Sequence, residues 1–178
     1  MIETADRQRL LQLARDAIVA HLSGLPAPAA APSPIMDRRA GVFVSLHKGD
    51  ALRGCIGHIE PDQPLSRAVP GSAIAAASTD PRFAPVTTEE MIELGIELSI
   101  LGPLERITGA GDFEVGRHGL LVERGWNRGL LLPQVAVEWG WDAEAFLSQT
   151  CHKAGLPLDA WKSAATIWRF EAEVFSER

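Results

Sequence analysis

The sequence has few cysteines and lacks a long apolar run, and both absences restrict what the protein can be. A membrane-spanning helix needs about 18 or more consecutive apolar residues, whereas charged residues interrupt every apolar stretch of this 178-residue chain. The N-terminus is acidic and mixed, without the basic start and apolar run of a signal peptide. Its two cysteines, Cys55 and Cys151, form no CxxC pair. We therefore predict a cytoplasmic protein with reduced thiols and no contact with a membrane.

Positive charge is also scarce. Lys and Arg number 17 against 23 Asp and Glu, which gives a formal net charge of −6. Gripping a phosphate backbone requires clustered cations, so we expect no strong binding of nucleic acid, although a local basic pocket is compatible with this balance. The five histidines have no metal-ligand spacing, and GxGxxG, P-loop and GxSxG motifs are missing. The sequence predicts neither a metal site nor a cofactor.

The pattern of apolar residues predicts helices and strands that do not alternate regularly. An amphipathic helix over 10–22 is followed by a Pro/Ala-rich connector at about 25–34 and by a hairpin over 41–59. A helix from about Leu65 should kink or break at Pro70. Later elements are a strand over 92–101, short strands around 115, 120–122 and 130–132, helices starting at Pro133 and after Asp142, and a strand over 165–175. This order favours an α+β fold with antiparallel sheets flanked by helices.

The most informative segment is Leu52-Arg53-Gly54-Cys55-Ile56-Gly57-His58. On a regular strand Leu52 and Ile56 would face the core, while Arg53 and Cys55 would share the opposite face. A guanidinium beside a thiol favours the thiolate, as a nucleophile or redox thiol requires. Gly54 and Gly57 would let a ligand or another backbone approach closely. The alternative is structural, because free cysteines are often buried and strand glycines often mark bulges.

Three further residues are candidates for a site. His118, in Gly116-Arg117-His118-Gly119, is either an acid/base partner of the thiol or a turn histidine bonded to backbone. Glu97 lies on the polar face of its strand, where it either lines a cleft or faces water. Arg82 either clamps an anion or pairs with Asp80.

Taken together, these motifs resemble the AMMECR domain family, in particular its prokaryotic branch, which takes its name from the AmmeMemoRadiSam system. The resemblance covers nearly the whole chain and is strongest at 52–57, 80–83, 97–99, 116–119, 131–136, 140–142 and 170–175. It implies one AMMECR-type domain over 1–178, with two subdomains, a cleft between them near the Leu-Arg-Gly-Cys-Ile-Gly segment, and a RAGNYA-like core. It also implies an association with a Memo-like protein and a radical-SAM enzyme, but no settled activity.

Three functional hypotheses follow. The leading one is a binding or accessory component that holds a small anion, nucleotide or peptide-like ligand in the cleft through Arg53, Gly54, Gly57 and Arg82. The second is an enzyme that uses Cys55 as nucleophile, with His118 or Glu97 as acid/base. The third is a protein-interaction module in which the signature segment is structural.

Overall fold

The computed structural model describes residues 1–177 and divides into two compact units. Unit 1 consists of residues 1–101 together with the end of the chain from Glu173, and unit 2 runs from Gly102 to Ala172. Each unit contains antiparallel strands and helices, so the predicted α+β class is confirmed. The RAGNYA-like core and the cleft between subdomains stay predictions.

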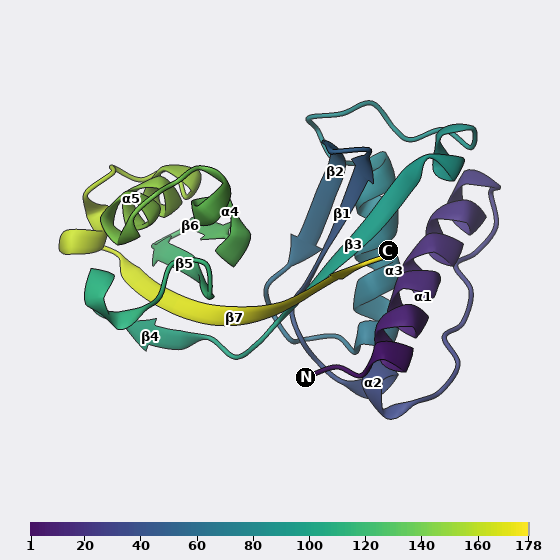
Figure 1. Cartoon of the computed structure of the whole chain (residues 1–178), viewed down its shortest axis with the longest axis horizontal. Coiled ribbons are helices and arrows are strands. Elements are labelled where there is room, and N and C mark those ends of the chain that lie inside the picture. Colours follow the sequence, from purple (N-terminus) through teal and green to yellow (C-terminus); the bar gives the residue numbers. More distant parts are fainter. Residues whose placement is uncertain (178) are drawn as a thin grey trace. The chain divides into compact units, whose positions relative to one another are not determined.

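Unit 1 is built on a three-stranded antiparallel sheet with the order β2-β1-β3, joined by the end of β7. Its elements are α1 (Thr4–Leu22), α2 (Pro34–Asp37), β1 (Val42–Lys48), β2 (Ala51–His58), α3 (Leu65–Ser78), the 3-10 turn η1 (Glu90–Ile92) and β3 (Leu94–Leu101). Helices α1 and α3 lie side by side along the strands (Figure 1). The predicted hairpin is confirmed as β1 and β2.

The first helix forms and ends as its sequence predicts. Its apolar stripe, which includes Leu10, Ala14 and Ile18, is buried. Gly24 follows with φ of +70°, and Leu25 donates its backbone N–H to the Ala20 carbonyl. Glycine adopts this left-handed conformation without strain, so it terminates the helix.

Helix α3 runs through Pro70 without a break, so of the two predicted alternatives, a kink or a break, the break is wrong. Pro70 lies close to the start of the helix, and its missing N–H removes only the bond to the Ser66 carbonyl. Its ring is buried against the unit 1 core. The apolar packing of the helix therefore outweighs the local cost of the proline.

The sheet of unit 1 has one apolar and one polar face. Val42, Val44 and Leu46 share the face packed against the helices, and the predicted core positions Leu94, Ile96, Leu98 and Ile100 are buried on it. Ile56 is half-buried against the same core. The other face carries the alternate residues of the same strands.

Leu52 does not belong to this core, so the prediction that its side chain faces the core is wrong. Leu46 pairs with Gly54 but His47 pairs with Leu52, so Arg53 is the extra residue of a β-bulge. A bulge shifts the alternation by one residue. Leu52 therefore lies on the face of His47 and is 39% exposed.

The strand predicted over 92–101 begins two residues later than expected. Ile92 closes the 3-10 turn η1 and is 91% exposed, although the alternation of apolar residues includes it. Strand β3 starts at Leu94, whose backbone pairs with Lys48 of β1. The alternation of apolar residues identified the strand. Its first residue is set by β1, which ends at Lys48, the partner of Leu94.

Unit 2 has the strand order β4-β7-β5-β6, with all pairs antiparallel. Its elements are β4 (Glu105–Ile107), η2 (Ala110–Asp112), β5 (His118–Arg124), β6 (Asn127–Leu131), α4 (Pro133–Glu138), α5 (Ala143–Lys153), η3 (Ala160–Lys162) and β7 (Thr166–Ser176), which continues into unit 1. Phe146 and Leu147 of α5 pack on Leu120 and Val122 of β5.

The helices predicted at Pro133 and after Asp142, the strands predicted around 120–122 and 130–132 and the final strand are confirmed. Asp142 caps α5 by accepting the Ala145 N–H at 2.8 Å. The short strand expected around Val115 is wrong, because this residue lies in a turn. Strand β4 was not predicted. It is three residues long, too short for alternation to be recognised.

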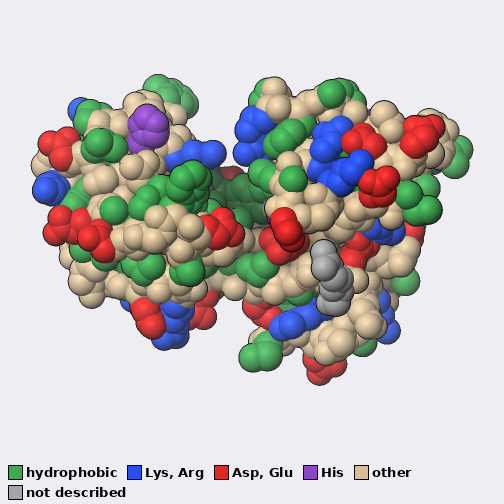
Figure 2. Space-filling view, turned by 45° about the horizontal axis from the view of Figure 1, so that its top comes forward, with side chains coloured by type: hydrophobic (Ala, Val, Ile, Leu, Met, Phe, Trp, Pro, Cys, Tyr) green, Lys and Arg blue, Asp and Glu red, His purple; other side chains and the backbone are tan. Residues whose placement is uncertain are grey.

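None of the helices within residues 1–177 is both long and apolar enough to cross a membrane. On the face shown in Figure 2, Lys and Arg side chains lie among Asp and Glu side chains, without a broad field of one sign. This distribution fits the formal net charge of −6.

Candidate functional site

A row of three polar residues crosses the polar face of the unit 1 sheet. Ser45 pairs with Cys55 on one side and with Glu97 on the other, so the three side chains project from neighbouring strands. Directly opposed Cβ atoms lie about 4.5–5.5 Å apart. The Ser45 hydroxyl donates to the Cys55 sulfur at 3.3 Å. A thiol, a hydroxyl and a carboxylate thus stand in line on one surface.

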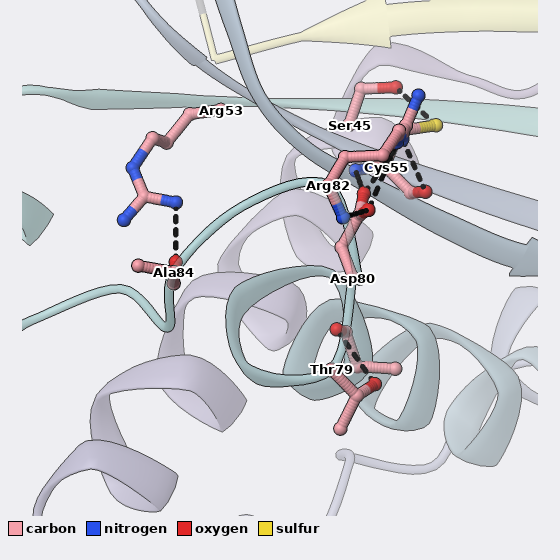
Figure 3. A network of polar contacts seen from close by, with 8 residues as sticks. Ser45, Arg53, Cys55, Thr79, Asp80, Arg82 and Ala84 are labelled. Carbon is pink, nitrogen blue, oxygen red and sulfur yellow. Dashed lines mark hydrogen bonds and ion pairs between the residues drawn. The ribbon is translucent and has the colours of Figure 1, made fainter.

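The backbone of Cys55 is held by two side chains from the loop after α3 (Figure 3). Its N–H donates to Asp80 Oδ2 at 2.9 Å, and its carbonyl accepts from Arg82 Nη2 at 3.2 Å. Asp80 in turn accepts from Arg82 Nε at 3.0 Å and Nη2 at 2.7 Å. Strand β2 is the edge strand of this sheet, so its outer backbone groups have no partner strand. Asp80 and Arg82 provide the hydrogen-bond partners of the Cys55 backbone at this edge.

This ion pair is asymmetric in its exposure to solvent. The Asp80 side chain is 2% exposed and the Arg82 side chain 50% exposed. Hydrogen bonds from Arg82, then from the backbone of Cys55 and Arg82, hold the pKa of Asp80 far below its ordinary value. The pKa of Arg82 is raised, mainly by Asp80 and also by the nearby Cys55 thiol. A fixed cation therefore lies beside Cys55 and reaches solvent.

That cation is Arg82, whereas the sequence pointed to Arg53. Arg53 is the bulge residue, and its Nε and Nη2 donate to the two Glu90 carboxylate oxygens at 3.0 Å. Its Nη1 donates to the Ala84 carbonyl at 2.8 Å, away from the group formed by Ser45, Cys55, Asp80 and Arg82 (Figure 3). Arg53 thus ties the segment 84–90 to β2.

The two glycines of the signature face the protein's own backbone. A Cβ at Gly54 would lie 2.3 Å from the Ala76 carbonyl oxygen of α3, and one at Gly57 would lie 2.2 Å from the Val42 carbonyl oxygen. Side chains cannot occupy such positions without a shift of the backbone. Close packing inside unit 1 is therefore sufficient to require glycine at both positions.

His118 lies at the start of β5 in unit 2, while Cys55, Arg82 and Glu97 belong to unit 1. The side chain of His118 is 10% exposed, and its Nδ1 accepts the Glu114 backbone N–H at 3.0 Å. His118 thus makes the backbone hydrogen bond expected in one of the two alternatives, but from the start of a strand rather than from a turn. Its participation in a site with Cys55 stays a prediction.

Sequence reasoning missed Ser45, Glu90 and His47. Ser45 and Glu90 become neighbours of the signature only through strand pairing and loop folding. His47 lies two residues from Ser45 on the same strand, and its Nε2 is buried without a hydrogen bond. The motif Asp80-Pro81-Arg82-Phe83 drew attention to Asp80 in the sequence. The sequence did not show that the Asp80 carboxylate would accept a hydrogen bond from the edge strand β2.

Within the described residues 1–177, no three His, Cys, Asp or Glu side chains are grouped to hold a metal ion.

The sequence matches the AMMECR1 family over residues 11–175. A protein of Methanothermobacter thermautotrophicus is 50% identical in an alignment that covers 94% of this chain and 92% of that one. A protein of Thermococcus kodakarensis is 47% identical in an alignment that covers 94% of this chain and 88% of that one. The fold is similar to the crystal structure of an uncharacterized protein, PH0010 from Pyrococcus horikoshii, with a TM-score of 0.90 and 45% identity over 95% of this chain and 90% of that one.

Proposed function

The chain belongs to the AMMECR1 family, and we propose that it is a cytoplasmic binding component of a modification system with a Memo-like protein and a radical-SAM enzyme. In this role it holds a small anionic or peptide-like ligand on the polar face of the unit 1 sheet. The partners are those that the family resemblance implies. The ligand class is argued from the residues around Cys55.

One observation carries the proposal. The half-exposed guanidinium of Arg82 is oriented beside Cys55 by a carboxylate that is itself buried. Keeping an ionised carboxylate out of water is costly unless it is well paired. The pair fixes a cation at the surface of a strand, where it can receive a carboxylate or phosphate oxygen. The buried Ser45 adds a hydroxyl beneath Cys55, to whose sulfur it donates at 3.3 Å.

Glu97 limits the charge of the ligand. It shares the row with Ser45, and its side chain makes no hydrogen bond or ion pair with another residue within 1–177. A highly charged phosphate chain would meet this carboxylate, whereas a single carboxylate at the end of a peptide would be repelled less. We therefore favour a monoanion or a peptide C-terminus over a polyphosphate.

We expect an N-acetylated dipeptide with a free C-terminal carboxylate to bind the intact chain in a calorimetric titration, with inorganic phosphate and AMP as competing probes. R82K keeps the positive charge but loses the planar guanidinium, whose N–H groups can donate to two oxygens at once. We expect R82K to bind the dipeptide about tenfold more weakly, which is within the range for the loss of a hydrogen bond to a charged group. E97Q should strengthen it by about threefold, because a nearby like charge is removed.

The matched control is R9Q, because Arg9 is an exposed arginine of the same unit that pairs only with Asp6. Its binding should equal that of the wild type. Equal affinity of R82K and R9Q for all three probes would refute the site. Copurification of the wild-type chain with coexpressed Memo-like and radical-SAM proteins tests the partners separately.

A second candidate function is an enzyme with Cys55 as nucleophile. The favouring observation is that the Cys55 sulfur accepts from Ser45 and lies beside Arg82, so two donors can stabilise negative charge on it. Glu97 and His47 lie on the same face as candidate proton acceptors. Arg53 has no part in this version.

Alkylation by iodoacetamide should distinguish the two thiols of the native protein. Cys55 is half-buried, while Cys151 is wholly buried and its pKa is raised by burial. The thiolate is the reactive form, so Cys55 should be modified at least tenfold faster. Peptide mass spectrometry over time measures both rates in one sample. Equally slow modification of both cysteines would argue against a catalytic thiol.

A further inference from the structure

An exposed aromatic surface lies in unit 2, where α4 ends and the chain turns into α5 (Figure 1). Trp139 is 70% exposed and Val137 is 61% exposed, although both side chains are apolar. Together with Trp141 they form what we call the Trp139 patch. Contiguous apolar side chains that stay in contact with water mark binding surfaces, and Trp contributes strongly to protein interfaces. The ligand site proposed above uses none of these residues.

The backbone after α4 fixes the position of Trp139. Gly140 adopts φ of +64°, and its N–H donates to the Val137 carbonyl at 3.1 Å. Trp141 donates its N–H to the Ala136 carbonyl at 2.9 Å, which completes a Schellman ending of the helix. The Trp141 ring packs on the core of unit 2 and stacks against the Trp139 ring, with centroids 6.0 Å apart and planes at 15°. A half-buried ring therefore holds the exposed one in place.

The charges that the sequence places around the patch are all negative. Residues 129–152 contain Glu138, Asp142 and Glu144 but no Lys or Arg, and all three carboxylates are exposed. Glu138 precedes Trp139 and Asp142 follows Trp141, so both carboxylates lie within about 10 Å of the rings, the Debye length in dilute salt. The side chains of Glu138 and Glu144 make no hydrogen bond or ion pair with another residue within 1–177.

One cation, Arg117, comes close to the patch through the fold. Val137 Cγ2 lies 3.1 Å from the place of a Cβ at Gly116, the residue before Arg117. The Arg117 guanidinium donates through Nε to Glu171 at 2.8 Å, and its Nη1 lies 3.8 Å from Glu114. Two carboxylates therefore neutralise this cation, and it leaves the charge of the patch negative.

We infer that the Trp139 patch binds an arginine-bearing segment of a partner protein. The face of an indole ring attracts a cation, and a guanidinium group is planar, weakly hydrated and stacks on the ring. Glu138 and Glu144 accept its N–H groups at the rim. An acidic segment would be repelled by these carboxylates. The inference does not rest on the proposed ligand site, whose residues belong to unit 1.

The probe is the peptide acetyl-Arg-Gly-Arg-Gly-Arg-amide, with matched peptides that carry Lys or Gln in place of Arg. During titration into the intact chain, we expect the Arg peptide to shift and saturate the NMR signal of the Trp139 indole N–H. The Lys peptide should bind more weakly and the Gln peptide should not bind. W139A should weaken binding about three- to fivefold, as expected for one exposed cation–π contact. E138Q/E144Q should weaken it about threefold, through the loss of two exposed charge pairs.

Trp126 provides the matched control. It is 103% exposed in the turn between β5 and β6, but its neighbours Arg124 and Arg128 are cations. An indole beside these cations is poorly placed to receive another one. W126A should therefore bind the Arg peptide as the wild type does, and so should R82K, which alters unit 1.

The inference would be overturned by no binding of the Arg peptide at millimolar concentration, by equal binding of the Arg and Gln peptides, or by equal affinity of W139A and W126A. Binding of the wild type to phosphatidylcholine vesicles, or a dimer in sedimentation that W139A abolishes, would assign the patch to a membrane or to a second copy instead. Because Trp139 is exposed, W139A should fold normally, and an unchanged melting temperature would verify this. E138Q/E144Q tests the charges with the aromatic rings intact.

Discussion

Replacing Arg82 with alanine is expected to lower the free energy of unfolding by about 3–5 kcal/mol at neutral pH. The reason lies in the asymmetry of the pair with Asp80. Arg82 is half exposed, but Asp80 is almost wholly buried. R82A would therefore leave an ionised carboxylate in the protein interior, with only backbone N–H groups to stabilise it. Urea denaturation at pH 7 measures the loss.

Two further measurements make this prediction specific. The double variant R82A/D80A should recover part of the loss, because it removes the buried charge. In the wild type the lowered pKa of Asp80 gives stability that is present above its ordinary value of 3.8 and is lost as the pH falls through the lower value in the folded state. The deficit of R82A should therefore shrink below about pH 4, where its Asp80 becomes protonated.

The control for this series is R9A, which breaks an exposed pair with Asp6 and should cost less than about 0.5 kcal/mol. An R82A protein as stable as R9A would contradict the account of the pair. The account would also be contradicted if the difference in unfolding free energy between the wild type and R82A stayed constant down to pH 3. The charge of Asp80 would then make no contribution to that difference.

Replacing Gly54 with alanine is expected to cost about 3 kcal/mol, the upper part of the usual range for overpacking. The added Cβ would lie 2.3 Å from the Ala76 carbonyl oxygen, which belongs to the backbone of α3. A flexible side chain could move aside, but here the helix and the strand must separate. Thermal unfolding of G54A measures the cost.

The matched control lies on the same helix. A Cβ at Gly71 meets nothing within 4 Å, and this residue is exposed inside α3. Alanine is a better helix former than glycine by roughly 0.5–1 kcal/mol, so G71A should raise the stability. If G54A were as stable as the wild type, the glycine would not be required by packing, and close approach of a ligand would become the better explanation.

Much of unit 1 could be predicted because its elements follow local patterns. Alternation identified β3, the 3.6-residue period identified α1, and two β-rich runs within 41–59 identified the hairpin. Leu52 was assigned to the wrong face because a bulge arises from the pairing of two strands. Nothing in the residues 51–58 alone shows that Arg53 is the extra residue.

The candidate site was only partly predictable for the same reason. Cys55, Glu97 and Arg82 were identified, but the sequence could not show that Arg82 rather than Arg53 lies beside the thiol. That choice depends on Asp80, which is 25 positions from Cys55 in the chain and reaches its backbone across an open strand edge. Contacts between distant segments leave no periodic signal in a single sequence.

The most direct test of the binding site is the NMR signal of the Arg82 side-chain Nε–Hε group during titration with the acetylated dipeptide. We predict that this signal and the amide signal of Cys55 shift and saturate together, with the affinity found by calorimetry, while the Arg9 side-chain signal does not move. A saturating titration in which the Arg82 and Cys55 signals stay unchanged would contradict the proposed site.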